Sequence, residues 1–248
     1  MIDLSLCHAK PVAAGSVPPP DAADQLHVWR WEVGGAQDAW LAQLDPVEQQ
    51  QHQRFVTPEL SRRFLAAHGG LRQVLAGYLD CQPDELEFER APKGKPFLPD
   101  RALEFNISHS GDEVVLVVGR QPVGIDIEFT RSITDLRRLA EKYFTDNELA
   151  DLRGLPDDVA LGYFLQIWTR KEAIVKLTGL GLGASVRLLD VASVSCDFCR
   201  IELPPQWETN LNIGWLADLT VANNCYGAIA SQDRPIEVRC FALASCAG

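Results

Sequence analysis

Hydrophobic periodicity predicts two long amphipathic helices. Apolar residues recur at three- and four-residue steps through 54–79 and again through 161–178, which is the spacing of a helix with one buried face. Asp45-Pro46 is a typical signal for the start of another helix. Shorter helices are predicted at 38–44, 134–143 and 147–152.

Alternating and continuous apolar runs predict the strands. Six segments show such patterns between turn residues: 27–33, 103–108, 114–118, 123–128, 225–231 and 236–241. The strand–turn–strand pattern of 114–128 returns weakly in 225–241, as expected of two similar halves in tandem. Residues 1–25 are predicted to be irregular, because Val17-Pro18-Pro19-Pro20 forbids a helix. We therefore predict an α+β protein with an irregular segment at 1–25, one α+β half at 26–120 and a second at 121–248.

Composition narrows the class of protein. The 248 residues carry a net charge of −11, which argues against a nucleic-acid-binding protein because such proteins need a basic surface. The seven cysteines are odd in number, and the pair Cys196 and Cys199 has no second pair to complete a site, so neither a disulfide framework nor a zinc site is predicted. The sequence shows no signal-peptide pattern and no apolar run of about 18 residues. We expect a cytoplasmic protein that binds neither nucleic acid nor a membrane.

Two carboxylates share one face of the strand at 123–128. Side chains alternate along a strand, so Asp126 and Glu128 point away from the apolar Ile125 and Ile127. Neighbouring like charges raise each other's pKa unless a cation offsets them, and no cationic neighbour is present in the local sequence. Magnesium fits, because it takes one or two protein carboxylates together with phosphate oxygens and waters. A solvated acidic strand end is the alternative, and a bare Asp-x-Glu pattern does not decide between them.

The second long helix carries a third carboxylate with two lysines nearby. Glu172 continues the largely apolar column of Leu161, Leu165 and Trp168, where an unpaired carboxylate would be costly. Lys176 lies one turn further on, and Lys171 is adjacent in sequence. A carboxylate with two lysines nearby is suited to binding a phosphate through a metal ion. An ion pair between Glu172 and Lys176 within the helix, which would contribute only about 0.3–0.5 kcal/mol, is the alternative.

These segments carry a family resemblance when they are taken together with three others. The five motifs, in chain order, are Gly94-Lys95-Pro96, Phe105-Asn106-Ile107-Ser108-His109-Ser110-Gly111, Gly124-Ile125-Asp126-Ile127-Glu128, Phe144-Thr145-Asp146-Asn147-Glu148 and Trp168-Thr169-Arg170-Lys171-Glu172-Ala173-Ile174-Val175-Lys176. The chain resembles the 4′-phosphopantetheinyl transferases, in their longer, surfactin-synthetase-activating type, over residues 50–185 and more weakly to its end. The resemblance implies two similar α/β halves related by a pseudo-twofold axis, with the active site in the cleft between them.

The resemblance also implies a reaction and roles for named residues. A transferase of this family moves the phosphopantetheine arm of coenzyme A onto a serine of an apo carrier protein and releases adenosine 3′,5′-bisphosphate. Mg²⁺ is implied at Asp126, Glu128 and Glu172, with Glu172 also the catalytic base. The implied coenzyme A contacts are Arg54, Arg63, Gly94, Lys95, Pro96, Ser108, His109, Lys171 and Lys176. The family often has basic residues at 48–53, but this chain has no lysine there, which shifts the 3′-phosphate to Arg54, Arg63 and His109.

The acceptor protein requires a locally basic or apolar docking surface on this acidic chain. Carrier proteins are typically acidic, and like charges across an interface are unfavourable. A docking surface is predicted from Arg131, Arg137, Arg138, Lys142, Tyr143 and Phe144; an ordinary exposed helix is the alternative. The tandem halves predict a self-sufficient monomer. Two other functions remain open from the residues: a different magnesium-dependent phosphoesterase acting on a nucleotide, and a non-catalytic relative that binds carrier proteins. Which carrier is served stays open.

Overall fold

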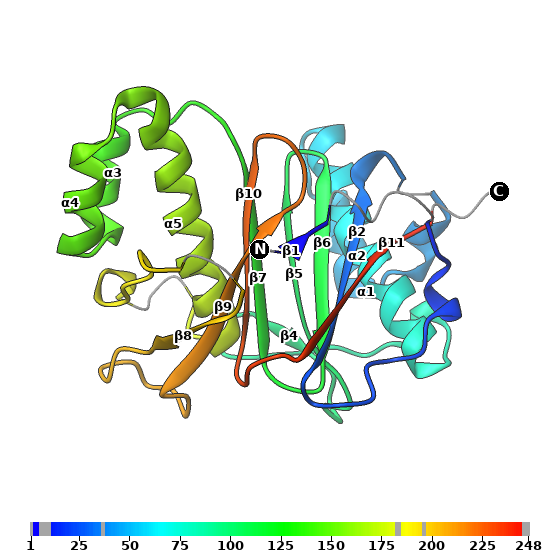
Figure 1. The fold of residues 1–248 in the computed structure, drawn as a ribbon. Coiled ribbons are helices and arrows are strands. Elements are labelled where there is room, and N and C mark those ends of the chain that lie inside the picture. Colours follow the sequence, from blue (N-terminus) through cyan, green and yellow to red (C-terminus); the bar gives the residue numbers. More distant parts are fainter. Residues whose placement is uncertain (1, 5–10, 36–37, 182–184, 195–196, 245–248) are drawn as a thin grey trace.

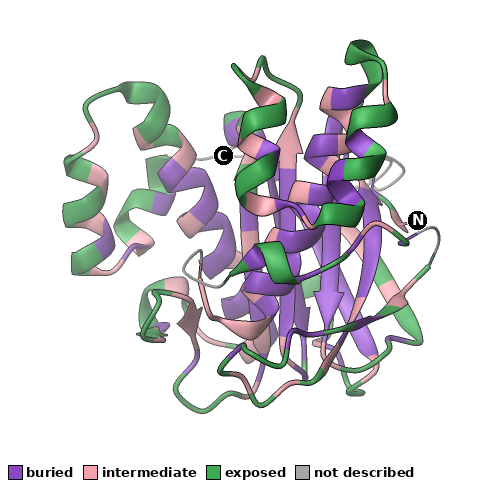
Figure 2. Cartoon of the chain, turned by 90° about the vertical axis from the view of Figure 1, so that its left-hand side faces the viewer, coloured by how far each residue is buried: buried purple, intermediate pink, exposed green. Residues whose placement is uncertain are grey.

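The protein consists of two β-sheets that pack face to face, with helices on the outer face of each sheet (Figure 1). The computed structural model describes residues 2–4, 11–35, 38–181, 185–194 and 197–244, and Cys196 lies outside these ranges. Buried residues follow the strands and the inner faces of the helices, whereas exposed residues follow the outer faces (Figure 2). This arrangement confirms the predicted mixed α+β class.

The first sheet has the strand order β11-β2-β6-β5. Its strands are β2 (Gln25–Glu32), β5 (Glu104–Ser110), β6 (Glu113–Gly119) and β11 (Glu237–Ala242). The flanking elements are α1 (Pro46–Gln53), α2 (Pro58–Leu79), the hairpin of β3 (Glu89–Arg90) and β4 (Pro96–Phe97), and the 3-10 turns η2 (Ala14–Ser16), η3 (Val33–Gly35), η4 (Asp38–Gln43) and η5 (Pro83–Glu85). Helix α2 packs on this sheet through Leu71, Val74 and Leu75, which meet Trp29 and Trp31 of β2.

The second sheet has the strand order β1-β9-β10-β7, and β8 pairs with β9. Its strands are β1 (Ile2–Asp3), β7 (Val123–Phe129), β8 (Cys199–Glu202), β9 (Ile213–Thr220) and β10 (Cys225–Ser231). Its helices are α3 (Leu136–Tyr143), α4 (Asp146–Gly154), α5 (Asp157–Thr178) and the 3-10 turn η6 (Val186–Leu188). Helix α5 covers the outer face, and α3 and α4 pack beside it (Figure 1).

The two halves repeat one topology. In the first half the order is β2, α2, β5, β6, with β6 paired between β2 and β5; in the second it is β7, α5, β9, β10, with β10 paired between β7 and β9. The terminal strands are exchanged between the halves, because β1 pairs in parallel with β9 and β11 pairs in parallel with β2. The predicted ranges 26–120 and 121–248 therefore do not coincide with the two sheets, because each sheet includes one strand from the other end of the chain.

Local sequence signals set the ends of the long helices. The segment predicted as one helix at 54–79 begins only at Pro58, since Thr57 accepts a hydrogen bond from the Leu60 amide and acts as the N-cap. The preceding Asp45-Pro46 signal does start a helix, α1, with Asp45 and Glu48 forming a capping box. Helix α5 ends at Gly179 in the left-handed conformation, with φ of 71°.

Some elements differ from the prediction. The segment at 38–44 forms the 3-10 turn η4, and strands β1, β8 and β9 were not predicted. Within the described residues, no helix is long and apolar enough to cross a membrane.

Three apolar cores correspond to the three interfaces. One lies between α2 and the first sheet, and one between α5 and the second sheet. The third lies between the two sheets and is built from β-branched and leucine side chains such as Val115, Val117, Ile125, Ile127 and Ile229. Strand β6 is buried on both faces, which explains why it reads as a continuous apolar run: Val114, Leu116 and Val118 face α2, and Val115 and Val117 face the other sheet.

A buried histidine on β2 makes the first sheet sensitive to acid. Trp29 Nε1 donates to the Tyr78 hydroxyl at 2.7 Å, and that hydroxyl lies 2.6 Å from His27 Nδ1. Burial, and then the charge of Arg239, lower the pKa of His27 to about 4. Because the unfolded histidine takes up a proton near its ordinary pKa, protonation favours unfolding.

We expect the stability contributed by a neutral His27 to be complete above about pH 6.5 and to be lost as the pH falls towards 4. Between pH 7 and pH 4.5 the free energy of unfolding of the wild type should fall by about 2 kcal/mol more than that of His27→Gln. Urea denaturation at both pH values measures this difference. Equal losses in the two proteins would exclude His27 as the titrating group.

Candidate active site

The carboxylates of β7 lie where α5 comes closest to the strand. An added Cβ at Gly124 would lie 2.0 Å from the carbonyl oxygen of Ala173 and 2.5 Å from the amide nitrogen of Leu177, both backbone atoms of α5. Only glycine therefore allows the two backbones to approach this closely. The contact brings the end of α5 beside Asp126, one strand step beyond Gly124 on the same face.

Gly124→Ala should separate α5 from β7. We expect the free energy of unfolding to fall by about 3 kcal/mol or more, because the clash is with backbone atoms that cannot rotate away. Gly154→Ala is the control, since nothing lies within 4 Å of a Cβ at that position. Chemical denaturation of both variants tests this, and equal stability of the two would show that the helix can shift without cost.

Asp126 is held by two neighbours and leaves one oxygen unused. Ser108 Oγ donates to Asp126 Oδ1 at 2.9 Å, and Lys176 Nζ lies 2.7 Å from the same oxygen. Lys176 Nζ also donates to the Ile125 carbonyl oxygen at 3.1 Å. Asp126 Oδ2 is buried and has no hydrogen-bond partner among the described residues. The expectation of a carboxylate pair without a cationic neighbour is thus wrong for Asp126, because Lys176 reaches it from α5.

Glu128 and Glu172 complete a group of three carboxylates. Ser110 Oγ donates to Glu128 Oε2 at 3.0 Å. Burial raises the pKa of Glu128, with the charge of Asp126 adding to the shift. Burial, and then the charge of Asp126, raise the pKa of Glu172 to about 7. Glu172 Oε1 is buried and has no partner within the described part of the chain.

One cavity joins these side chains. Its volume is about 290 Å³, and it is lined by Ile107, Ser108, His109, Asp126, Ile127, Glu128, Trp168, Glu172 and Lys176. The structure therefore brings together all three predicted metal ligands with three of the predicted coenzyme A contacts. Burial lowers the pKa of His109, and the charges of Lys176, Arg63 and His68 lower it further. His109 thus lies between cationic groups of both halves.

The donor set suits a hard divalent cation. Two buried carboxylate oxygens, on Asp126 and Glu172, lack partners, and oxygen ligands are what Mg²⁺ prefers. Among the residues that the structure describes, no three histidine, cysteine, aspartate or glutamate side chains lie in an arrangement that could by itself hold a metal ion. Phosphate oxygens and water would have to complete the coordination of a cation at these carboxylates.

Lys171 does not belong to the cavity. Its side chain is fully buried, with Nζ 2.9 Å from Glu148 Oε2 of α4. The ammonium also donates to the carbonyl oxygens of Val186 and Leu189, so its three donors are all used. The predicted phosphate contact of Lys171 is therefore contradicted. The physical reason is the helical turn of about 100° per residue, which sends Lys171 towards α4 when Glu172 faces β7.

The remaining predicted coenzyme A contacts do not line this cavity. Gly94 has φ of 91° in the tight turn between β3 and β4, as predicted. Lys95 Nζ donates to the carbonyl oxygens of Val123 and Lys176, both at 2.8 Å, and so fixes this turn to the ends of β7 and α5. Burial lowers the pKa of Lys95 to about 8.

The two predicted arginines differ in their surroundings. Arg63 of α2 pairs with Glu59 at 2.7 Å, and its Nε is buried without a partner among the described residues. Arg54 is exposed at the C-terminal end of α1 and does not line the cavity. Arg63 is therefore the better placed of the two for a ligand.

The predicted docking cluster is divided by the fold. Phe144 is fully buried and stacks on Phe164 with ring centroids 5.1 Å apart, so its prediction as a surface residue is wrong. Arg137 donates to the carbonyl oxygens of Leu152 and Leu155 and pairs with Asp157, which ties α3 to the junction of α4 and α5.

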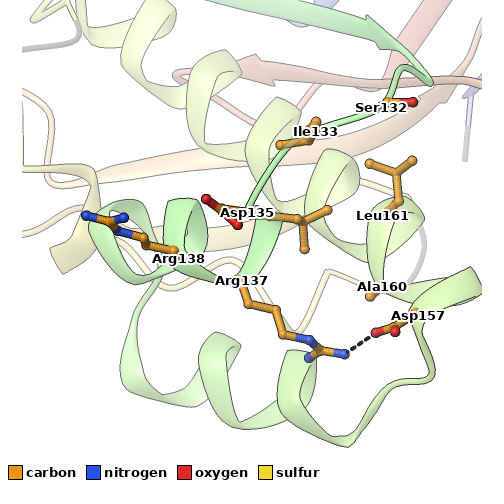
Figure 3. A pocket seen from close by; sticks show the side chains of 9 residues that line it. Ser132, Ile133, Asp135, Arg137, Arg138, Asp157, Ala160 and Leu161 are labelled. Atoms are coloured by element: carbon orange, nitrogen blue, oxygen red, sulfur yellow. Dashed lines mark hydrogen bonds and ion pairs between the residues drawn. The ribbon is translucent and has the colours of Figure 1, made fainter.

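The other basic residues of this cluster remain exposed. Arg131, Arg138 and Lys142 lie on the surface. A cavity of about 700 Å³ lies beside α3, and its apolar lining includes Ile133, Leu136 and Leu161. Figure 3 shows that Arg137 reaches Asp157 and that Arg138 points away from Asp157.

Sequence reasoning missed the roles of two alternating strand residues. Asn106 and Ser110 were seen as parts of a motif but given no function. Both lie on the face of β5 that meets β7: Asn106 Oδ1 accepts from the Ile125 amide at 2.9 Å, and Ser110 Oγ accepts from the Phe129 amide at 3.0 Å. The two-residue spacing of Asn106, Ser108 and Ser110 was the available signal, because it puts all three side chains on one strand face.

Two family models cover most of the chain. The model described as 4′-phosphopantetheinyl transferase superfamily matches residues 122–228, and the model described as 4′-phosphopantetheinyl transferase, N-terminal, matches residues 30–121. The two matches meet between residues 121 and 122.

Curated proteins show the same likeness over long alignments. The chain is 34% identical to the 4′-phosphopantetheinyl transferase HetI of Nostoc over 216 residues, which covers 84% of this chain and 88% of that protein. It is 32% identical to the 4′-phosphopantetheinyl transferase Sfp of Bacillus subtilis over 67% of this chain and 74% of that protein. It is 33% identical to the L-aminoadipate-semialdehyde dehydrogenase-phosphopantetheinyl transferase of Xenopus laevis over 70% and 64% of the two chains.

Proposed function

The chain belongs to the 4′-phosphopantetheinyl transferase superfamily, and on that premise we propose which of its residues carry the reaction. The enzyme transfers the phosphopantetheinyl group of coenzyme A to carrier proteins. The observation that supports our assignment is the cavity of about 290 Å³ in which Asp126, Glu128, Glu172 and Lys176 meet. The two unpartnered carboxylate oxygens point to a cation as the group that completes this site.

Asp126, Glu128 and Glu172 would hold Mg²⁺. When bound, the ion neutralises charge on the pyrophosphate of coenzyme A and on the departing phosphate. Lys176 can then bind a phosphate oxygen with a charged hydrogen bond, since its ammonium has a third donor beyond those given to Asp126 and Ile125. His109 lines the same cavity and would bind a phosphate oxygen from the side of the first half.

Glu172 would act as the base. The hydroxyl oxygen of the carrier serine attacks the phosphorus atom that bears the pantetheine arm and loses its proton to the Glu172 carboxylate. The bond to the other phosphate breaks, and adenosine 3′,5′-bisphosphate leaves. Without a cation, burial raises the pKa of Glu172 to about 7, and a cation bound beside it would favour the charged carboxylate that can accept the proton.

The rest of coenzyme A would extend towards the first half. Gly94, Lys95 and Pro96 are proposed to line the adenine site. Arg63 is proposed to meet the 3′-phosphate together with His109, because its charge contributes to the lowered pKa of that histidine. Arg54 is the more distant candidate. Lys171 has no part in this scheme, and Ser108 acts through Asp126.

We propose that the carrier protein docks beside α3, on the surface formed by Arg131, Arg138, Lys142 and the cavity of Figure 3, whose lining is part apolar and part charged. Arg138→Glu should raise the KM for an acidic carrier by about tenfold and leave the KM for coenzyme A unchanged, because a charge at the rim of an interface mainly affects encounter. Arg153→Glu, at the exposed end of α4, is the control. Steady-state kinetics at low and high salt measure both, and equal values would place the docking surface elsewhere.

The experiment that tests the function is direct. The enzyme is incubated with coenzyme A, Mg²⁺ and a panel of apo carrier proteins from fatty-acid, polyketide and peptide synthesis, and intact-mass spectrometry detects the gain of one phosphopantetheinyl group. Transfer that ends when Mg²⁺ is chelated is expected, with adenosine 3′,5′-bisphosphate as the co-product. Release of that nucleotide without any acceptor would contradict the assignment. We propose a monomer, since one chain supplies both halves, and sedimentation measures that property.

A further inference from the structure

Two edge strands from different sheets meet through side chains at the active site. Strand β5 pairs through its backbone with β6, and β7 pairs through its backbone with β10. Between β5 and β7, three side chains of β5 accept hydrogen bonds from alternate amides of β7. They are Asn106 Oδ1 from Ile125 at 2.9 Å, Ser108 Oγ from Ile127 at 3.3 Å and Ser110 Oγ from Phe129 at 3.0 Å. We call these three contacts the seam.

The two serines of the seam also hold the carboxylates. A hydroxyl has one proton and two lone pairs, so each serine can accept from an amide and donate to an acid at once. Ser108 Oγ donates to Asp126 Oδ1 at 2.9 Å, and Ser110 Oγ donates to Glu128 Oε2 at 3.0 Å. Asn106 makes the first contact only, because the matching position of β7 is Gly124, which has no carboxylate to receive a hydrogen bond.

These contacts fix the orientation of the Asp126 carboxylate. One of its oxygens is fixed by Ser108 and Lys176, and the other, Oδ2, is buried without a partner among the described residues. Without Ser108 the carboxylate could turn about its terminal torsion, which has no sharp preferred angle. The Ser108 hydroxyl and the Lys176 ammonium therefore together leave Oδ2 as the oxygen available for a ligand.

We propose that Ser108 and Ser110 are positioning residues that orient Asp126 and Glu128 for the divalent cation, so that cation affinity depends on the hydrogen bonds from these two hydroxyls to the carboxylates. The proposal rests on the metal site proposed above. Hydrogen bonds to metal-binding carboxylates fix their direction, and their removal typically weakens metal binding by about 10–100-fold.

The seam contains its own control. Ser108→Ala and Ser110→Ala each remove a seam contact together with a carboxylate contact. Asn106→Ala removes a seam contact to the same strand, β7, but removes no contact to a carboxylate. Ser110→Thr keeps the hydroxyl at a half-buried position and should restore what Ser110→Ala loses.

The test measures Mn²⁺ binding to the full-length enzyme by electron paramagnetic resonance, with coenzyme A at saturation, and thermal unfolding without metal. Both serine-to-alanine variants should bind Mn²⁺ about 10–100-fold more weakly than the wild type. Ser110→Thr and Asn106→Ala should stay within about threefold of the wild type. All three alanine variants should unfold at a temperature lower by a few degrees.

The results of this experiment distinguish failure of the positioning role from failure of the proposed metal site. Wild-type enzyme that shows no saturable Mn²⁺ binding beyond that of coenzyme A alone would contradict the metal site itself. Wild-type binding with unchanged affinity in both serine variants would overturn only the positioning role. Equal weakening in Asn106→Ala would also overturn it, because the effect would then come from the seam in general.

Discussion

Asp126→Ala should reduce turnover by about 10²–10³-fold or to below detection, with the fold retained. Asp126 provides one of the two buried carboxylate oxygens that lack a partner among the described residues, and it forms an ion pair with Lys176. Its loss removes a carboxylate that would hold the cation, and the cation would stabilise the negative charge that develops on the phosphates. Removing a single stabilising group of this kind typically lowers turnover by about 10²–10³-fold. The measurement is carrier modification at saturating coenzyme A over a range of Mg²⁺ concentrations.

The stability of the Asp126→Ala variant provides a second readout. Three clustered carboxylates alone would predict a small gain in stability when one is removed. Since Lys176 already pairs with Asp126 and is about one quarter exposed, we expect instead a loss of up to about 1 kcal/mol. Asp158→Ala, an exposed residue of the first turn of α5, should change neither activity nor stability. Full transfer at limiting Mg²⁺ in Asp126→Ala would refute the metal assignment.

Glu172→Gln should lower kcat by more than about 10²-fold, the lower end for the loss of a general base. Glutamine keeps the shape of the side chain but cannot take the serine proton. Binding of coenzyme A in the presence of Mg²⁺, measured by calorimetry, should fall much less than turnover. If binding and turnover fall together, Glu172 serves only as a ligand and the base lies elsewhere.

Lys176→Ala is the matched comparison, because it lies one turn from Glu172 and faces the same cavity. It removes a cation from a phosphate that retains its other contacts, and a charged hydrogen bond is worth about 1.5–3 kcal/mol. We expect an effect of about 10–100-fold, mainly in the KM for coenzyme A. A pure kcat effect in Lys176→Ala would mean that Lys176 acts in the chemical step.

The sequence alone was sufficient to predict the long helices and most of the strands. Period-two and period-3.6 patterns depend only on which face of an element is buried, so β2, β5, β6, β7, β10, β11 and the long helices could be predicted from the chain itself. The boundaries were less certain where one proline or cap decides them, as at Thr57 and Pro58. Strands β1 and β8, with two and four residues, are too short to give a pattern. Strand β9 does alternate, with apolar residues at 213, 215, 217 and 219, and this was the signal that could have predicted it.

The tertiary structure decided which charges meet. Sequence neighbours suggested that Lys171 and Lys176 act together, but α5 turns Lys171 towards Glu148 and Lys176 towards Asp126. Likewise, Phe144 is a motif residue that packing places in the core. A helix fixes the angle between its own side chains, but which of its faces meets which neighbour depends on how it packs.

The sequence by itself thus determined the chemistry available: three carboxylates, a lysine and a histidine in motifs of one family. Only the folded chain determined their geometry. Gly124 lets α5 approach β7, and Asn106, Ser108 and Ser110 join β5 to β7 across the two sheets. Hydrogen bonds and ion pairs act over a few ångströms between residues that are far apart in the chain, so they are set by the packing of the two halves and cannot be inferred from local patterns.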